Sequence, residues 1–196
     1  CVVISTQNLL RFKKNLGTHL NFYSYKSVLS STNMSFDISL LEMIIPLLNG
    51  QMVHLLSNGY TLNPKKMIRV IEENPIEVVQ FTPSHLRFLG MYSKHKFSFL
   101  KQVKVLLVGG EQFPIELYND ITNGTQAIIY NMYGPTEATI WSSYKRITVC
   151  GDNSIGNPME GCSFSVHDEN GDIVKDGEYG ELYISGDQIA MGYTDV

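Results

Sequence analysis

Cysteine is scarce in this chain of 196 residues. The three that occur, Cys1, Cys150 and Cys162, are far apart and form no CxxC pair or Cys/His cluster. This distribution argues against a disulfide framework and a structural zinc site, and it indicates thiols in a reducing, cytoplasmic setting. No apolar run reaches the roughly 20 residues that cross a membrane. The net charge of −4 comes without a basic stripe, so neither nucleic acid nor a membrane is an expected partner.

Short apolar runs alternate with amphipathic ones from residue 5 to about 145, which is the pattern of a βα series. Ser5 and Asn63 are expected helix caps, Gly17 an expected helix end and Pro46 an expected bend. The predicted fold class is α/β, a mostly parallel β-sheet flanked by helices, with ligands beyond the carboxyl ends of its strands. The predicted strands are 26–32, 51–56, 77–82, 103–110 and 127–134, and the predicted helices are 6–16, 38–50, 63–74, 83–95 and 114–122.

Beyond about residue 145 the pattern changes to short alternating segments separated by turns. These segments lie at 145–149, 162–168, 171–175 and 180–186, and Asn170-Gly171 is a favourable hairpin turn. We therefore expect a parallel-sheet core at 1–146 that carries the site and an incomplete, small antiparallel β subdomain at 147–196. The chain starts on an apolar run without methionine, so we expect it to be a piece of a longer protein.

Three strand-to-helix junctions place polar residues or glycines at the same end of the predicted sheet: "SFDIS", "VGGEQFP" and "NMYGPTE". Taken singly, each has a local explanation. Asp37 and Thr136 can cap helices, and Gly109 and Gly110 can allow a tight turn. Convergence at one rim predicts a binding site instead.

The third junction carries the groups that a nucleotide needs. Tyr133 offers a flat face to a base, and Asn131, two residues back on the same face of the strand, offers an amide to the base edge. Thr136 at a helix start would place a hydroxyl beside free backbone N–H groups, and Glu137 can hold magnesium. A nucleotide would satisfy all four residues together.

The stretch "NMYGPTE" at 131–137 resembles the Asn-x-Tyr-Gly-Pro-Thr-Glu motif of the adenylation domains of nonribosomal peptide synthetases, which belong to the adenylate-forming acyl and aminoacyl ligases. "FDIS" at 36–39 is similar to that family's Phe-Asp-x-Ser segment, and "GELYISGDQIAMGY" at 180–193 to its Gly-Glu-Leu-x-Ile-x-Gly segment. The motifs occur in the family order and cover almost the whole chain. The resemblance implies a central part of the large N-terminal domain of such an enzyme.

The resemblance also implies how ATP is bound. The ring of Tyr133 would stack on adenine, and Asn131 would meet its exocyclic amine. Thr136 would bind the α-phosphate, and Glu137 would bind Mg²⁺. The nucleotide-binding residues so implied are Gly110, Glu111, Asn131, Tyr133, Gly134 and Thr136, with the backbone at 110–111 on the far side of the base.

The implied reaction is attack of an amino acid carboxylate on the α-phosphate of ATP with release of pyrophosphate. The aminoacyl group would then pass to the phosphopantetheine thiol of a peptidyl carrier protein. Such catalysis is mainly positioning and charge neutralisation, so Thr136 and Glu137 are the expected catalytic residues. Carrier protein and neighbouring synthetase domains are the implied partners.

The family lines its amino acid pocket at positions that can be carried over by the motifs. Asp37 would bind the substrate ammonium group, and Trp141 above all would fill the space for a side chain, which leaves room for glycine. Any one of the aliphatic residues could equally be ordinary core. The implied substrate-binding residues are Asp37, Ile38, Leu41, Gln80, Leu107, Gly109, Met132, Ile140 and Trp141.

Three alternatives stay open. A D-alanine–carrier protein ligase would need space for a methyl group, and an acyl-CoA ligase would leave Asp37 unpaired. A noncatalytic docking module is favoured by Gln188, where a glycine is usual, and by Met191, where arginine is common. The family's glycine-rich phosphate loop, Tyr-x-Thr-Gly-Asp segment and lysine-bearing C-terminal domain do not occur here. We therefore expect the chain to bind nucleotide weakly at most and not to turn over.

Overall fold

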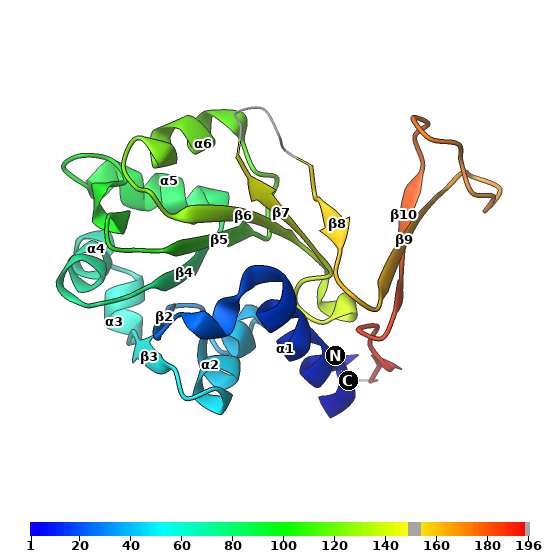
Figure 1. Ribbon diagram of the computed structural model, residues 1–196, viewed down its shortest axis with the longest axis horizontal. Coiled ribbons are helices and arrows are strands. Elements are labelled where there is room, and N and C mark those ends of the chain that lie inside the picture. The colour runs from blue at the N-terminus through cyan, green and yellow to red at the C-terminus, as the bar shows by residue number, and fades with distance from the viewer. Residues whose placement is uncertain (149–153, 195–196) are drawn as a thin grey trace.

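The computed structural model describes residues 1–148 and 154–194, and its centre is a seven-stranded sheet of order β3-β2-β4-β5-β6-β7-β8 (Figure 1). The first five strands of this order are parallel, which confirms the predicted fold class. The last two strands add antiparallel to β6 and to each other. The strands are β2 (Ser27–Ser30), β3 (Met52–Leu55), β4 (Val78–Phe81), β5 (Val105–Gly109), β6 (Ile128–Tyr133), β7 (Ser143–Ile147) and β8 (Asn157–Pro158).

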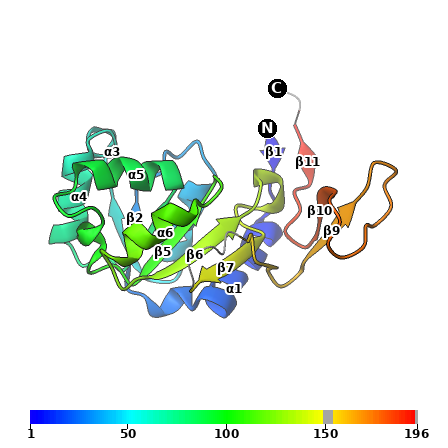
Figure 2. The same ribbon diagram turned by 90° about the horizontal axis from the view of Figure 1, so that it is seen from above.

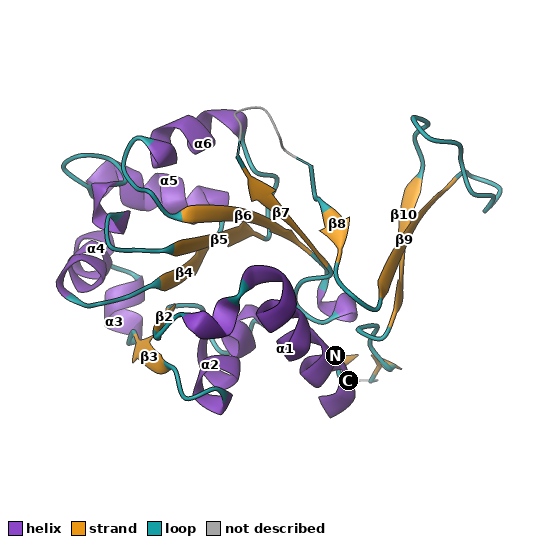
Figure 3. Cartoon of the chain, in the orientation of Figure 1, coloured by secondary structure: helices purple, strands orange, loops and turns teal. Residues whose placement is uncertain are grey.

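Helices cover both faces of this sheet (Figures 1 and 3). One face carries α1 (Thr6–Leu20) and α2 (Ile45–Leu48), and the other carries α4 (Pro64–Glu73), α5 (Pro83–Tyr92) and α6 (Ile115–Thr122). A short helix α3 (Asn58–Thr61) precedes α4. The expected caps are confirmed: Ser5 Oγ accepts from the Asn8 backbone N–H at 3.1 Å, and Asn63 Oδ1 accepts from that of Lys66 at 3.1 Å.

Two helix predictions were wrong in detail. α1 does not end at Gly17 but continues to Leu20, and Asn21 takes the left-handed conformation with φ 51°. Gly17 is instead a packing position, because a Cβ there would lie 2.6 Å from the ring of Tyr23. The predicted helix at 38–50 is present as a helical segment at 38–48, but its middle is a π-helical stretch η2 (Leu40–Ile44), which the four residues of α2 follow. Leu47 and Leu48 on α2 are exposed rather than buried.

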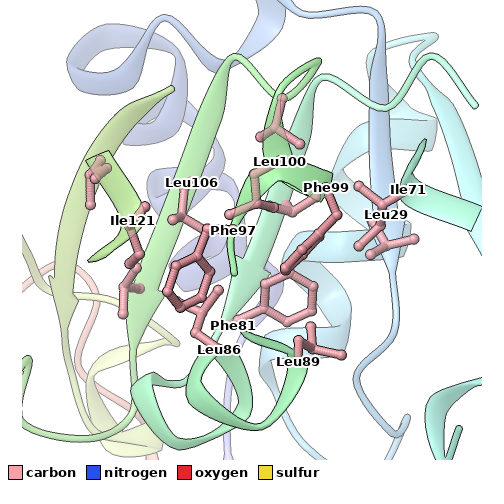
Figure 4. Close-up of a cluster of buried hydrophobic side chains, with 14 of the residues drawn as sticks. Leu29, Ile71, Phe81, Leu86, Leu89, Phe97, Phe99, Leu100, Leu106 and Ile121 are labelled. Atoms are coloured by element: carbon pink, nitrogen blue, oxygen red, sulfur yellow. The ribbon is translucent and has the colours of Figure 1, made fainter. Parts of the chain in front are cut away.

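The two faces have separate hydrophobic cores, because successive strand residues point to opposite sides. On β5, Leu106 lies in the core under α4, α5 and α6, and Leu107 lies in the core under α1 and α2. Figure 4 shows the first of these cores, in which Phe81, Phe97 and Phe99 pack among leucine and isoleucine side chains. Three-residue 3₁₀ turns at Phe22–Ser24 (η1), Ser98–Leu100 (η3) and Thr136–Ala138 (η4) complete the elements of this layer structure.

The antiparallel part differs from its prediction. The segment expected at 145–149 belongs, as far as it is described, to β7 of the large sheet, which crosses the expected boundary at 146. A two-stranded hairpin of β9 (Cys162–His167) and β10 (Glu181–Gly186) projects beside that sheet (Figure 1). The Asn170-Gly171 turn forms, with Gly171 at φ 86°, but the expected strand at 171–175 is reduced to one bridge between His167 and Ile173.

The two ends of the chain lie side by side, since β1 (Val2–Val3) pairs antiparallel with β11 (Gly192–Tyr193) (Figure 2). Cys1 is an exposed free thiol and Cys162 a buried one, whereas Cys150 lies outside the described residues. Within residues 1–148 and 154–194, none of the helices has the length and apolar composition needed to cross a membrane.

Candidate functional site

A cavity of about 400 Å³ opens at the carboxyl ends of β5 and β6. It is where a parallel α/β sheet is expected to bind its ligand. Seven of the residues predicted from the sequence line it: Gly110, Glu111, Asn131, Met132, Tyr133, Gly134 and Trp141. The other lining residues are Gln112, Phe113, Pro135 and Ile155. The remaining predicted residues do not line this cavity and are Asp37, Ile38, Leu41, Gln80, Leu107, Gly109, Thr136, Glu137 and Ile140.

Asn131 and Tyr133 share one face of β6, as the strand alternation requires. The Asn131 side chain is buried, and its Nδ2 donates a hydrogen bond to the Ser154 carbonyl at 2.8 Å. This bond uses one of the two N–H groups of the amide, and Oδ1 is the acceptor that a donor on a ligand would meet. This orientation suits the exocyclic amine of a purine.

The junction after β5 is a tight turn in which Gly110 has φ 83°, a conformation that favours glycine. Glu111 follows it and turns its carboxylate toward α5, where Oε2 accepts from the Ser84 backbone N–H at 3.0 Å and from Ser84 Oγ at 2.5 Å. Partial burial opposes ionisation of Glu111, but the donors of Ser84 outweigh it and lower the pKa of this carboxyl. The side chain therefore fixes the junction to α5, which leaves the backbone at 110–111 to face the cavity.

Trp141 forms one wall of the cavity and is almost fully buried. Its Nε1 donates to Gln80 Oε1 at 3.2 Å, which joins two predicted substrate residues that are 61 positions apart. The ring lies against β5 at Gly109, where a Cβ would be 2.7 Å from Trp141 Cη2 and 2.6 Å from the Met132 carbonyl oxygen. Gly109 is thus required for the close approach of this indole to the sheet.

The aliphatic residues predicted for the substrate pocket are core residues in the structure. Leu41, Leu107, Met132 and Ile140 are at most 2% exposed and belong to the core under α1 and α2, which also contains Trp141. Ile38 packs against the same core. Of these five residues, Met132 also reaches the cavity wall.

Asp37 is partly buried at the start of the helical segment 38–48. Its backbone carbonyl accepts the first helical hydrogen bond from the Leu40 N–H at 2.9 Å, so Asp37 lies at the N-cap position of this segment.

Thr136 and Glu137 do not begin a helix of several turns, contrary to the expectation. They lie in η4, which has three residues, Pro135 as its N-cap and no side-chain cap hydrogen bond. Thr136 is exposed, and Glu137 Oε1 accepts a hydrogen bond from the Tyr193 hydroxyl at 2.8 Å. This bond raises the pKa of the Tyr193 phenol. A single 3₁₀ turn supplies fewer free N–H groups than a helix N-terminus does.

Glu42 is a buried acid that the sequence reasoning missed. Its carboxylate is fully buried and accepts hydrogen bonds from the backbone N–H groups of Ser31 at 2.7 Å and Thr32 at 2.8 Å and from Thr32 Oγ1 at 2.7 Å. Burial raises its pKa to about 7, against the effect of these donors. The bonds tie η2 to the loop after β2 that leads to Asp37. The available signal was one glutamate in the otherwise apolar run "ISLLEMIIPLL".

Comparison with known sequences gives one family over nearly the whole chain. The family described as AMP-binding enzyme matches residues 1–194. A dimodular nonribosomal peptide synthase of Bacillus subtilis (strain 168) is 30% identical over 194 residues, which cover 98% of this chain and 8% of that protein. A D-alanine–D-alanyl carrier protein ligase of Bacillus velezensis is 27% identical over 198 residues, which cover 98% of this chain and 39% of that protein.

Solved structures agree with the sequence relatives. A holo four-domain nonribosomal peptide synthetase bound to AMP and glycine has a TM-score of 0.89 at 30% identity, over 98% of this chain and 14% of that one. The N-terminal subdomain of Klebsiella oxytoca NpsA, in complex with anthranilyl-AMSN, has a TM-score of 0.80 at 24% identity, over 99% of this chain and 49% of that one, and shows the fold alone. The chain therefore spans only a small part of the synthetases that it matches.

Proposed function

The chain belongs to the AMP-binding enzyme family, and we propose that it is the central part of an adenylation domain that activates glycine for nonribosomal peptide synthesis. Its relatives include adenylation domains of nonribosomal peptide synthetases. The proposed reaction is glycine plus ATP to glycyl-AMP plus pyrophosphate, followed by loading onto a carrier protein thiol. The observation that carries the proposal is the common cavity of Tyr133, Asn131 and Trp141.

The nucleotide half of the cavity is built from β6 and the junction after β5. Tyr133 would supply a ring for the adenine face, and Asn131 Oδ1 would accept from the exocyclic amine, a proposal that their shared cavity supports. Gly110 takes the left-handed conformation of this junction, and Gly134 allows close packing on the turn that carries Trp141, because a Cβ at Gly134 would lie 2.6 Å from the Ser142 backbone nitrogen. A volume of about 400 Å³ lies in the range of small-molecule sites.

Magnesium fits the site only as an ion that arrives with the nucleotide. The described residues contain no group of three or more His, Cys, Asp or Glu side chains that could hold a metal. One carboxylate, Glu137, is nevertheless what Mg²⁺ uses when it keeps its waters and binds the phosphates of a substrate. The ion would neutralise phosphate charge, and the hydroxyl of Thr136 would donate to the α-phosphate.

The amino acid half is bounded by Trp141, whose indole is fixed between Gln80 and the bare backbone of Gly109. This wall favours glycine, because a larger side chain would have to displace a buried ring. Asp37 would pair with the substrate ammonium group, the one charge that distinguishes an amino acid from a fatty acid. The carboxylate of the substrate is then held for attack on phosphorus, and catalysis comes from positioning.

The other parts of the proposal concern the whole protein. A peptidyl carrier protein and neighbouring synthetase domains are the proposed partners, and the cytoplasm, which supplies ATP and free amino acids, is the proposed compartment. The lysine-bearing domain and the phosphate loop of the family do not occur in this chain. We therefore expect the 196 residues to bind nucleotide weakly at most and not to turn over, and detectable ATP–pyrophosphate exchange would contradict that expectation.

The test is calorimetric titration of the chain with nonhydrolysable glycyl- and alanyl-adenylate mimics. We expect the glycyl mimic to bind more tightly. Asp37→Asn should weaken it by at least about 10-fold, since an ammonium group loses its charged partner. Asp120→Asn on α6, which removes a carboxylate that pairs with Lys96 at 2.5 Å, is the matched control and should change nothing.

Each alternative has its own outcome. Preference for the alanyl mimic would support a D-alanine–carrier protein ligase, of which relatives occur at 27% identity. Binding of neither mimic would support a noncatalytic docking module. Either result would overturn the assignment to glycine activation.

A further inference from the structure

The turn that carries Trp141 has a backbone conformation that its own sequence does not favour. Thr139 and Ile140 both have positive φ, 58° and 69°. Both are β-branched, and such residues are outliers in the left-handed region. A turn of this kind persists only where surrounding structure holds it. The residues that hold it therefore also determine where Trp141 lies.

Gln188, which lies far from this turn in the sequence, forms hydrogen bonds along its whole length. Its side chain is fully buried, and its Nε2 donates to the carbonyl oxygens of Ala138 at 3.2 Å and Trp141 at 2.9 Å. Its backbone carbonyl accepts from Thr139 Oγ1 at 2.6 Å. The three bonds connect one residue to the beginning, the middle and the end of the strained turn.

Gln188 is itself fixed to α1. Asn15 Nδ2 donates to Gln188 Oε1 at 2.6 Å, and Asn8 Nδ2 donates to the carbonyl oxygens of Asp187 at 2.8 Å and Ile189 at 3.0 Å. Asn8 and Asn15 are seven residues apart, which places them on the same helix face. Oε1 of Gln188 accepts one bond and Nε2 donates two, and these three bonds together determine the orientation of the Gln188 amide.

The position of the indole follows from this connection. Its backbone carbonyl is held by Gln188, and its ring nitrogen is held by Gln80 on β4. Loss of the first bond would release the turn while the second still held the ring edge. The wall at Trp141 would then shift or tilt within the cavity that it lines.

We propose that Gln188 is a positioning residue that sets the depth of the amino acid pocket by holding the 138–141 turn, and so enforces the preference for the smallest substrate. This inference rests on the proposed function. It also gives Gln188 a role in substrate selection, whereas the sequence alone links this residue to a noncatalytic docking module. Gln188 does not contact the reacting atoms, and its effect passes through Trp141.

The chain offers a direct probe, because Trp141 is its only tryptophan. We expect Gln188→Met, which keeps the volume but removes the amide, to red-shift the Trp141 emission and to increase its quenching by acrylamide. The ratio of glycyl to alanyl mimic affinity should fall roughly 10-fold, within the range that one methylene group determines. Thr139→Val, which removes one of the three bonds with little change of shape, should act in the same direction and less strongly.

Asn8→Ala is the matched control. It removes two hydrogen bonds to the same 187–189 segment and the two that Asn8 Oδ1 accepts from Ser5, but none to the 138–141 turn. It should lower the thermal midpoint while leaving the Trp141 emission and the affinity ratio as in the wild type. If Asn8→Ala and Gln188→Met move all readouts equally, Gln188 has a structural role only and the proposal is overturned.

The outcomes separate this proposal from the proposed function. If the wild type binds neither mimic, glycine activation fails, while the emission and quenching of Gln188→Met and Thr139→Val still test whether the turn is held by Gln188. If the wild type prefers the glycyl mimic and both variants keep its emission, quenching and affinity ratio, the positioning role is wrong. Thr139→Val keeps the test decisive if Gln188→Met does not fold.

Discussion

The two faces of the central sheet differ in composition and in what they position. The face under α4, α5 and α6 is closed by a continuous apolar cluster that includes Leu106 (Figure 4). The face under α1 and α2 contains Leu107 but also buries Glu42, Asn15, Gln80 and Gln188. Buried polar groups are costly unless they are hydrogen-bonded, and here they fix the loops that carry the candidate site. The face under α4, α5 and α6 therefore mainly stabilises the fold, with Asn131 of the candidate site at its β6 edge, and the face under α1 and α2 buries more of the polar groups that position loops.

Leu106 and Leu107 give the sharpest test of this difference, since they are neighbours on β5 and both fully buried. Either leucine replaced by alanine should lower the free energy of unfolding by about 2–5 kcal/mol, measured by urea denaturation. Only Leu107→Ala should also raise the affinity for the alanyl-adenylate mimic relative to the glycyl one, because its cavity adjoins Trp141. Equal effects of both variants on that ratio would remove the functional distinction between the faces.

Glu42 predicts that stability falls as the pH rises, whereas His85, which packs on Phe81 of the other face and whose pKa burial lowers, predicts the opposite sign there. The pKa of Glu42 is raised to about 7 in the folded state by burial. Between its unfolded pKa, near 4.5, and 7 the folded state binds more protons, so stability is highest at acidic pH and is lost as the pH rises. The full loss above pH 7 is about 3 kcal/mol.

Glu42→Gln keeps an acceptor for the Ser31 and Thr32 N–H groups without the charge. In parallel urea titrations at pH 8, the free energy of unfolding of Glu42→Gln should exceed that of wild type by up to about 3 kcal/mol. At pH 5 the two should differ little. Glu72→Gln, at an exposed position of α4, is the control. A difference between wild type and Glu42→Gln that does not change with pH would contradict the raised pKa.

Gly109 tests the close contact between the sheet and the indole. A Cβ at this position would meet the Met132 carbonyl and the Trp141 ring, so Gly109→Ala should cost about 1–3 kcal/mol of stability through overpacking. It should also change the Trp141 emission. Gly59→Ala, where a Cβ has nothing within 4 Å, should leave both unchanged. Normal emission from Gly109→Ala would mean that the ring is not held against β5.

Tyr193 should give the smallest change in stability. Tyr193→Phe removes the exposed hydrogen bond to Glu137 Oε1 and should leave the unfolding transition unchanged within error. If Glu137 binds the Mg²⁺ of a nucleotide, the freed carboxylate should bind Mg²⁺·ATP more tightly in calorimetric titrations. Weaker binding would instead mean that Tyr193 holds Glu137 in its metal-binding orientation.

Local signals determined which features could be predicted from the sequence. Asn63 and Pro64 are adjacent and mark the start of α4, and the alternation on β6 places Asn131 and Tyr133 on one face. The prediction that α1 ends at Gly17 was wrong because a glycine at this position makes room for the ring of Tyr23 and does not end the helix. The π-helical stretch after Asp37 has no periodicity that distinguishes it from an α-helix in a short apolar run.

The residues that the sequence reasoning misjudged act over long separations. Asn15 and Gln188 are 173 positions apart, so no local pattern could pair them. In the sequence, Gln188 favours the alternative of a noncatalytic docking module, because only its departure from a motif is visible there. Thr136 followed its motif and was expected at the start of a helix, but the chain turns after three residues at η4. Motifs therefore located the cavity, whereas its supports depended on tertiary structure.

A crystal structure of the chain with the nonhydrolysable glycyl-adenylate mimic tests the central claim most directly. We expect the adenine against Tyr133 with its amine at Asn131 Oδ1, the glycyl group against Trp141, and the ammonium within hydrogen-bond distance of the Asp37 carboxylate. A mimic bound away from the ends of β5 and β6, or an Asp37 that faces solvent while the ammonium is bound elsewhere, would contradict the account.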